Sequence, residues 1–271
     1  MNRSYMKKKN SILIIAFIIV MMMYVIHVYA WNDPSDNDII WDINGTELRT
    51  VLVIDNIDSI IIPDGITKIS KAAFCINVES EIDFQDIKSI YIPNSVQTIG
   101  EAAFFNCISL QEVRLPEGLK IITPYMFSDC TSLERIVIPD SVEVIETNAF
   151  YGGTSLKEIN LPKSLLRIEA AAFKSCNQLQ SVVIPESVKE IGELAFCECT
   201  ALENIEVSEN TLVKAAAFEG TAFTENQNVD FLTVGSTLVR YNGSDTDVVL
   251  PDGITRIDDK AFYNNKKLLV W

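Results

Sequence analysis

Histidine is almost missing from this sequence. The 271 residues contain one, His27, and it lies in an N-terminal segment that we expect to direct export. The rest of the chain therefore lacks the commonest general base and the commonest protein metal ligand. We also find no glycine-rich phosphate loop and no Gly-x-Ser-x-Gly nucleophile motif. The sequence predicts a protein that is not an enzyme and that holds no cofactor and no metal.

Acidic residues are missing from the first 30 positions. Arg3 and Lys7–Lys9 form a basic start, the run Ile12–Val28 is almost wholly apolar, and Ala30 follows it. A basic start, an apolar centre and a small-residue cleavage site are typical of a secretory signal peptide. The apolar run also approaches the length that spans a bilayer. Residues 1–30 are therefore predicted to be a signal peptide or an uncleaved anchor, and either would place the remaining chain outside the cell or on its surface.

Basic residues are scarce relative to acidic ones. There are 22 Lys and Arg against 37 Asp and Glu, which gives a net charge of −15. Removing residues 1–30 would take away four basic and no acidic residues and leave −19. A protein this acidic is repelled by phosphate backbones and anionic lipid. We expect no nucleic-acid partner, and membrane contact only through an uncleaved N-terminal segment.

A 23-residue repeat dominates the rest of the chain. Five prolines lie 23 residues apart, and a phenylalanine follows each by 11 residues: Pro93, Pro116, Pro139, Pro162 and Pro185, with Phe104, Phe127, Phe150, Phe173 and Phe196. Further copies begin at Pro63 and Pro251, and Ser208 replaces proline in a degraded copy. A fixed period of this length indicates a stacked-repeat architecture of about eight coils.

The pattern within one repeat predicts its local structure. Alternate apolar residues precede the proline, as at Val113 and Leu115 before Pro116. This period of two is typical of a strand with one buried face, and proline ends such a strand because it has no N–H. A second apolar pair, such as Val96 and Ile99, predicts a short extended segment on the opposite side of the coil. The fold class is therefore a β-rich solenoid with a strand-lined concave face and short extended or helical segments on the convex side.

We divide the chain into three parts. Residues 1–30 are the export segment, residues 31–57 are a lead-in with strand entry, and residues 58–271 form the solenoid. Two inserts, at 76–86 and 221–248, interrupt the period of the solenoid. The acidic, polar character of the first insert suggests a loop on the surface.

The second insert repeats a feature of the lead-in. The lead-in is polar over Asn32–Asn44 and strand-like from Gly45. In the insert, Phe231–Val234 and Thr237–Tyr241 predict two strands that meet at Gly235. The sequence Gly-Ser-Thr-Leu at Gly235 resembles Gly-Thr-Glu-Leu at Gly45. We therefore expect the same structural element at both places.

Four of the six cysteines share one position, three residues after the repeat phenylalanine: Cys107, Cys130, Cys176 and Cys199. This spacing follows the repeat and does not match the spacing of metal ligands. We expect small buried residues in a ladder. Disulfides between neighbouring coils are the alternative, because coil spacing is close to the Cα separation that a disulfide needs and export favours oxidation.

Two copies of the repeat, Ile92–Leu110 and Ile184–Leu202, closely resemble the BspA-like class of leucine-rich repeat. Proline, Ser-Val, Ile-Gly, Ala-Phe and Cys fall in phase with that class, and the resemblance covers about residues 58–271. It implies a right-handed leucine-rich-repeat solenoid on a secreted or cell-surface protein. It also implies an adhesin-like function, with a partner on host matrix or on another cell surface.

Strand alternation identifies a candidate binding surface. Side chains two and four residues before each proline should point out of the concave face. Among them we expect partner contacts at Tyr91, Glu112, Arg114, Arg135, Val137, Glu158, Asn160 and Val183. Aromatic, arginine and exposed apolar side chains dominate binding hot spots. The predicted function is a non-enzymatic exported binding protein whose ligand is a protein or a glycan.

An alternative function follows from the C-terminal sequence. Leu268–Trp271 falls where the next strand should begin, and no polar cap follows it. A bare solenoid end exposes apolar core and strand edges. The alternative is therefore a structural or assembly module that docks another chain through its last coil, unless the reading frame is shortened.

Overall fold

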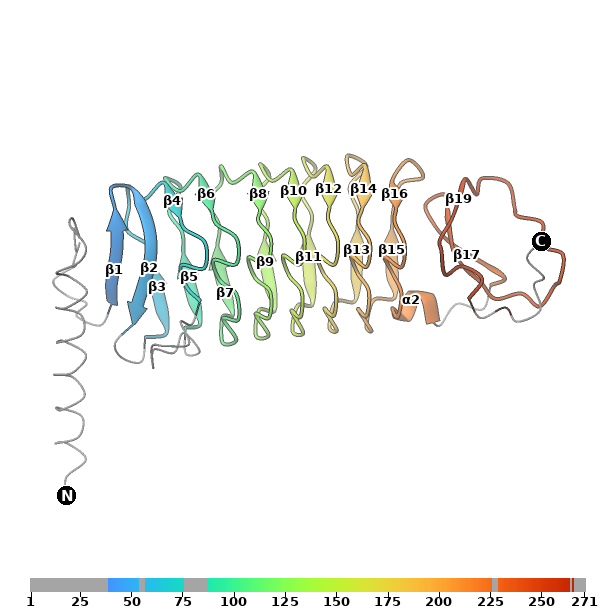
Figure 1. Ribbon diagram of the computed structural model, residues 1–271, viewed down its shortest axis with the longest axis horizontal. Helices are drawn as coiled ribbons and strands as arrows, with labels where there is room; N and C mark the ends of the chain where they lie inside the picture. Colours follow the sequence, from blue (N-terminus) through green and yellow to red (C-terminus); the bar gives the residue numbers. More distant parts are fainter. Residues whose placement is uncertain (1–38, 54–56, 76–86, 226–228, 264, 266–271) are drawn as a thin grey trace, which may run out of the picture.

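The computed structural model describes residues 39–53, 57–75, 87–225, 229–263 and 265, and shows coils stacked along one long axis (Figure 1). The predicted export segment, the insert at 76–86 and the C-terminal Leu268–Trp271 lie outside the described residues. Within the described ranges, no helix has the length and apolar character needed to cross a membrane. The β-rich solenoid fold is confirmed, with about 23 residues per coil.

The strands before the prolines form the first ladder of the solenoid. Each is three residues long, and its central residue points inward while the outer two are exposed or partly exposed. Parallel pairing joins most, but not all, neighbouring coils within this row (Figure 1). The strands are β3 (Ser59–Ile61), β5 (Ser89–Tyr91), β7 (Glu112–Arg114), β9 (Arg135–Val137), β11 (Glu158–Asn160), β13 (Ser181–Val183) and β15 (Asn204–Glu206).

A second ladder runs along the solenoid on another side of each coil, as the second apolar pair predicted (Figure 1). Its strands are two residues long and pair in parallel with the next coil. They are β4 (Lys68–Ile69), β6 (Thr98–Ile99), β8 (Ile121–Ile122), β10 (Val144–Ile145), β12 (Arg167–Ile168), β14 (Glu190–Ile191) and β16 (Leu212–Val213), and β19 (Arg256–Ile257) takes the same place in the last copy.

The third side of each coil, which carries the repeat phenylalanine, is a turn. Two positions per coil adopt positive φ, with non-glycine values between 53° and 62°. Examples are Ala171 and Ser175 in one coil, and Leu194 and Glu198 in the next. Left-handed backbone is unusual for residues such as alanine and leucine. Here it aims N–H groups at the following coil, as when the Ala171 N–H donates to the Glu193 carbonyl at 2.9 Å.

A column of stacked phenylalanines fills the interior behind these turns. Neighbouring ring centroids lie 4.9 to 5.4 Å apart, and every ring is buried. The alanine before most of these rings is also buried, which brings the backbone of the turn close to the core. The column consists of Phe74, Phe104, Phe127, Phe150, Phe173, Phe196 and Phe218. One such ring per coil makes each coil depend on its neighbours.

Two antiparallel hairpins confirm the predicted repeated element. The first joins β1 (Ile39–Asn44) to β2 (Glu47–Val53), and the second joins β17 (Phe231–Val234) to β18 (Thr237–Tyr241). Each turns at a glycine with positive φ, and each has one irregularity in register. The second strand of each hairpin then pairs in parallel with the next two-residue strand, β4 or β19. The sequence indicated strand structure only from Gly45 on, whereas the structure adds β1, which pairs with β2 on both sides of the irregularity between Asp42 and Ile43.

The second hairpin interrupts the solenoid after its seventh coil. The short helix α2 (Ala222–Glu225) follows that coil, and β16 and β17 do not pair with each other in the described sheets (Figure 1). Leu232, Leu238 and Ala261 are buried but lie outside the main hydrophobic cluster. Val234, in contrast, belongs to the main cluster, and Val239 packs against it. Residues 229–263 thus begin a second unit that opens with a hairpin and packs on the end of the first.

Candidate functional site

All eight side chains predicted to contact a partner lie on the exposed strand face, which we define as the outward positions of β3 to β15. Three of them, Glu112, Arg114 and Arg135, flank inward valine or isoleucine residues and are exposed. Val137 is 78% exposed and Val183 is 60% exposed, which is unusual for aliphatic side chains. Backbone pairing sets Arg135 beside Glu158 and Val137 beside Asn160 in neighbouring coils.

The strand face has two columns with different chemistry. The proximal column, two residues before the proline, is rich in apolar side chains: Ile61, Tyr91, Arg114, Val137, Asn160, Val183 and Glu206. The distal column, four residues before the proline, is polar: Ser59, Ser89, Glu112, Arg135, Glu158, Ser181 and Asn204. Equivalent residues repeat at the strand spacing of about 4.8 Å. A partner lying along the solenoid therefore meets an apolar line beside a polar line.

Sequence reasoning missed one member of the proximal column. Ile61 is 69% exposed and pairs in register with Tyr91. It lies two residues before Pro63, so the rule that selected Tyr91 also selects Ile61. The insert between the first two copies hid this equivalence. Val249, two residues before Pro251, is 86% exposed, although it lies outside a strand.

A cation–π contact orders part of the proximal column. The guanidinium carbon of Arg114 lies 5.0 Å from the centroid of the Tyr91 ring in the preceding coil. Strand pairing between β5 and β7 places these two residues in register. An arginine held over an aromatic ring loses less freedom when a partner binds. This pair is therefore a preorganised part of the strand face.

Ion pairs between coils lie beside the strand face. Lys88 contacts Asp58 at 3.0 Å, and Lys157 contacts Glu134 at 2.9 Å. In each pair the two residues come from successive coils and sit just before the strands. Hydrogen bonding and charge from Lys157 lower the pKa of Glu134 below its ordinary value. These charges are already matched within the protein.

The four repeat-phase cysteines are buried free thiols in the structure. Each Sγ donates to the carbonyl of a repeat phenylalanine in the preceding coil, as from Cys130 to Phe104 at 3.2 Å and from Cys199 to Phe173 at 3.1 Å. Burial raises the pKa of the Cys130 thiol well above its ordinary value. The prediction of a buried ladder is confirmed for Cys107, Cys130, Cys176 and Cys199.

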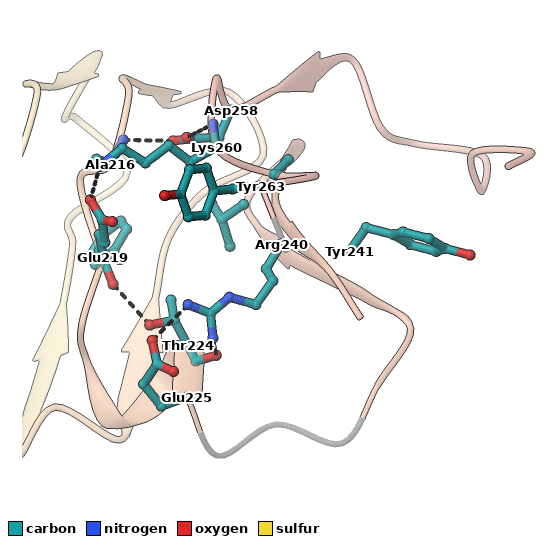
Figure 2. A pocket seen from close by; sticks show the side chains of 12 residues that line it. Ala216, Glu219, Thr224, Glu225, Arg240, Tyr241, Asp258, Lys260 and Tyr263 are labelled. Carbon is teal, nitrogen blue, oxygen red and sulfur yellow. Dashed lines mark hydrogen bonds and ion pairs between the residues drawn. The ribbon is translucent and has the colours of Figure 1, made fainter. Parts of the chain in front are cut away.

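The junction between the two units contains a cavity of about 210 Å³ (Figure 2). Arg240 donates to the Thr224 carbonyl and to Glu225, both at 2.6 Å, and Lys260 pairs with Glu219 at 2.5 Å. Figure 2 shows these side chains reaching from one unit to the other. The ion pairs of Arg240 and Lys260 join the two units. Because these two cations already have carboxylate partners, the cavity is a weaker binding candidate than the strand face.

Asp258 completes that junction (Figure 2). In the coils before it, the N–H at the first positive-φ position donates to a carbonyl of the next coil, as from Leu194 to Ala215 at 3.2 Å. In the last of these coils, the Ala216 N–H donates instead to the buried carboxylate of Asp258 at 2.7 Å. Asp258 therefore replaces the carbonyl that a regular coil would supply. Across the described ranges, no group of three His, Cys, Asp or Glu side chains could hold a metal ion.

Comparison with known families identifies the family of this chain. A family model described as the BspA type leucine rich repeat region matches residues 53–176, 83–202 and 120–241. The chain belongs to the BspA-type leucine-rich-repeat family. A comparison with curated proteins returns no match. Leucine-rich-repeat solenoids typically present an extended binding surface, and the strand face of this BspA-type protein has that form.

Two solved structures are similar to this BspA-type protein. A leucine-rich repeat protein of T. pallidum is 28% identical with a TM-score of 0.56, and the match covers 64% of this chain and 80% of that chain. A leucine-rich repeat protein of Bacteroides ovatus is 23% identical with a TM-score of 0.56, and the match covers 88% of this chain and 64% of that chain. This chain therefore spans less than two thirds of the Bacteroides ovatus protein. The second likeness concerns the fold alone.

Proposed function

We propose that this BspA-type protein is a non-enzymatic, adhesin-like binding protein of the cell surface or the extracellular medium. It contacts a protein or glycan partner, on host matrix or on another cell, along the strand face. The export segment predicted over residues 1–30 supports the location. Membership of the family and the extended solenoid support the binding role.

The observation that carries this proposal is the exposure of aliphatic side chains in one column. Ile61, Val137 and Val183 are each at least 60% exposed, and they share the proximal column with Tyr91 and Arg114. Single exposed apolar residues are common on protein surfaces, but an aligned set marks an interaction surface. Desolvating this column and the Tyr91–Arg114 pair supplies the binding energy, as at other hot spots.

Binding to a panel of immobilised extracellular-matrix proteins and cell-surface glycans tests the proposal. The variant Val137→Ser with Val183→Ser should bind at least about tenfold more weakly, because it removes exposed apolar surface from the proximal column. The control is Val229→Ser with Ile257→Ser, which removes exposed aliphatic side chains outside the strand face. Equal binding of the test variant and the wild type would remove the strand face from consideration.

A further inference from the structure

A line of acidic residues borders the strand face. The position after each repeat proline is exposed and mostly acidic, and we call its five carboxylates the acidic edge: Asp64, Glu117, Asp140, Glu186 and Glu209. Each lies three residues beyond the proximal column in its own coil. Asn94 and Lys163 occupy the same position in the other two of the seven coils before the second hairpin, and Asp252 follows Pro251 in the last copy. Coil stacking thus converts acids that are 23 residues apart in sequence into neighbours.

The acidic edge differs from the other charges of the solenoid because its carboxylates are not used internally. The ion pairs within the described residues involve other acids, such as Asp58, Glu134 and Glu143. Glu117 and Asp140 lie in successive coils, as do Glu186 and Glu209. At the strand spacing of about 4.8 Å, such like charges repel each other within one screening length. A cationic partner would remove that repulsion.

We propose that the partner of the strand face is a basic protein segment with apolar side chains, whose Lys or Arg residues contact the acidic edge while its apolar residues cover the proximal column. This inference rests on the proposed function and names the chemistry of its partner. The apolar column favours a polypeptide over a glycan, because Ile61, Val137 and Val183 offer no hydrogen bonds. A second copy of this chain is a poor occupant, since each copy carries a net charge of −15.

Peptide binding to the full chain tests the partner chemistry. The probe is a short fluorescent peptide that repeats Ser-Val-Lys, compared with versions that repeat Ser-Val-Glu or Ser-Ser-Lys. Fluorescence anisotropy should show tightest binding for Ser-Val-Lys, weakened by added salt because the charges are exposed. Equal affinity for the Ser-Val-Glu or the Ser-Ser-Lys version would overturn the inference, and so would no binding of any version.

Neutralising carboxylates of the acidic edge tests whether they contact the peptide. The edge variant carries Glu117→Gln, Asp140→Asn, Glu186→Gln and Glu209→Gln, none of which removes an ion pair of the described residues. It should bind Ser-Val-Lys at least about tenfold more weakly. The control carries Glu193→Gln, Asp230→Asn, Asp247→Asn and Asp259→Asn, which change the net charge equally at exposed positions outside the edge, and should lose less than about twofold.

The affinities of these variants distinguish a contact at the acidic edge from a contact at the strand face. Loss in the edge variant alone supports the inference, whereas equal losses in both variants would overturn it, because net charge would then explain the effect. Wild-type affinity in the edge variant would also overturn it. In that case, weaker binding to the matrix panel by Val137→Ser with Val183→Ser would still support the strand face as the binding surface.

Discussion

The guanidinium carbon of Arg114 lies 5.0 Å from the centre of the Tyr91 ring, one coil away. The two residues are 23 positions apart, and parallel pairing of β5 with β7 brings them into register. Their contact couples two coils through side chains on the exposed face. It therefore contributes to the stability of the solenoid as well as to the shape of the strand face.

A double-mutant cycle should measure this coupling. We expect Tyr91→Ala and Arg114→Ala to show an interaction free energy of about 0.5 to 1 kcal/mol, which is typical of an exposed cation–π pair. Urea denaturation of the wild type, both single variants and the double variant gives this value. Tyr91→Ala with Arg135→Ala is the control and should be additive within about 0.5 kcal/mol. Additivity in the Arg114 cycle would show that the pair does not interact in solution.

The close approach of coils at Gly192 predicts a steric effect. A Cβ at Gly192 would lie 2.5 Å from the backbone nitrogen of Ala170 in the preceding coil. We expect Gly192→Ala to lower the free energy of unfolding by about 1 to 3 kcal/mol, because backbone cannot move aside easily. Gly118→Ala is the matched control, since nothing lies within 4 Å of the place its new methyl group would take and its φ is not in the left-handed region. Equal thermal stability of the two variants would contradict this close packing of the coils.

Thiol reactivity should follow burial. Cys75 is half-buried and the other five cysteines are buried. Burial raises the pKa of the Cys75 thiol, so less of the reactive thiolate is present at a given pH. We expect Ellman's reagent to modify Cys75 slowly in native protein, faster as the pH rises, and the buried thiols only after denaturation. Cys75→Ser should abolish the native reaction. A denatured protein with fewer than six reactive thiols would instead indicate disulfides.

The raised pKa of Glu146 predicts that a substitution at this position changes the stability of the protein in a pH-dependent way. Burial, followed by the nearby charge of Glu169, raises this pKa above its ordinary value of 4.5, while Arg167 opposes the shift. The folded state then binds the proton more tightly than the unfolded state, so the charged form costs stability above the raised pKa. Glu146→Gln should stabilise the protein at neutral pH by about 0.5 kcal/mol or less, because solvent screens this partly exposed group. The gain should vanish below about pH 4.5, where both states are protonated.

A carboxylate with the opposite shift provides the control for that prediction. Hydrogen bonding from Lys157 lowers the pKa of Glu134, so its charged form stabilises the folded state above its ordinary pKa. Glu134→Gln should therefore destabilise the protein at neutral pH and lose its effect as the pH falls through the lowered pKa. Thermal melts of both variants across pH check the two signs. The same sign for both variants would contradict the assigned environments.

Periodicity made much of this fold predictable from sequence. A proline every 23 residues marks the end of each exposed strand, and alternation before it separates inward from outward side chains. The second hairpin was predictable because Phe231–Val234 and Thr237–Tyr241 alternate around a glycine. The exposed positions of the eight candidate contact residues followed from the same alternation, although their role in binding is still a prediction.

Features that depend on contacts between coils were not predictable. Ala171 and Leu194 adopt left-handed backbone although neither residue favours it, because the next coil supplies the hydrogen-bond acceptor. The β1 strand was missed because its apolar residues Ile39–Trp41 follow directly on the polar, acidic residues of the lead-in and were grouped with them. The acidic edge also emerges only when the coils are stacked. Local propensity contains no information on such neighbours.

The buried carboxylate of Asp258 predicts the behaviour of the junction between the two units. It accepts the N–H of Ala216 at 2.7 Å and the N–H of Lys260 at 3.0 Å. Asp258→Ala leaves both donors without this acceptor, which should cost about 1 to 3 kcal/mol. Because solenoid segments open separately, amide exchange at Ala216 is a better measure than global unfolding. Exchange there should accelerate in Asp258→Ala and recover in part in Asp258→Asn, whose amide oxygen can still accept. The exposed neighbour provides the control, since Asp259→Ala should leave the exchange unchanged. Unchanged exchange in Asp258→Ala would contradict a stabilising role of the Asp258 contact at this junction.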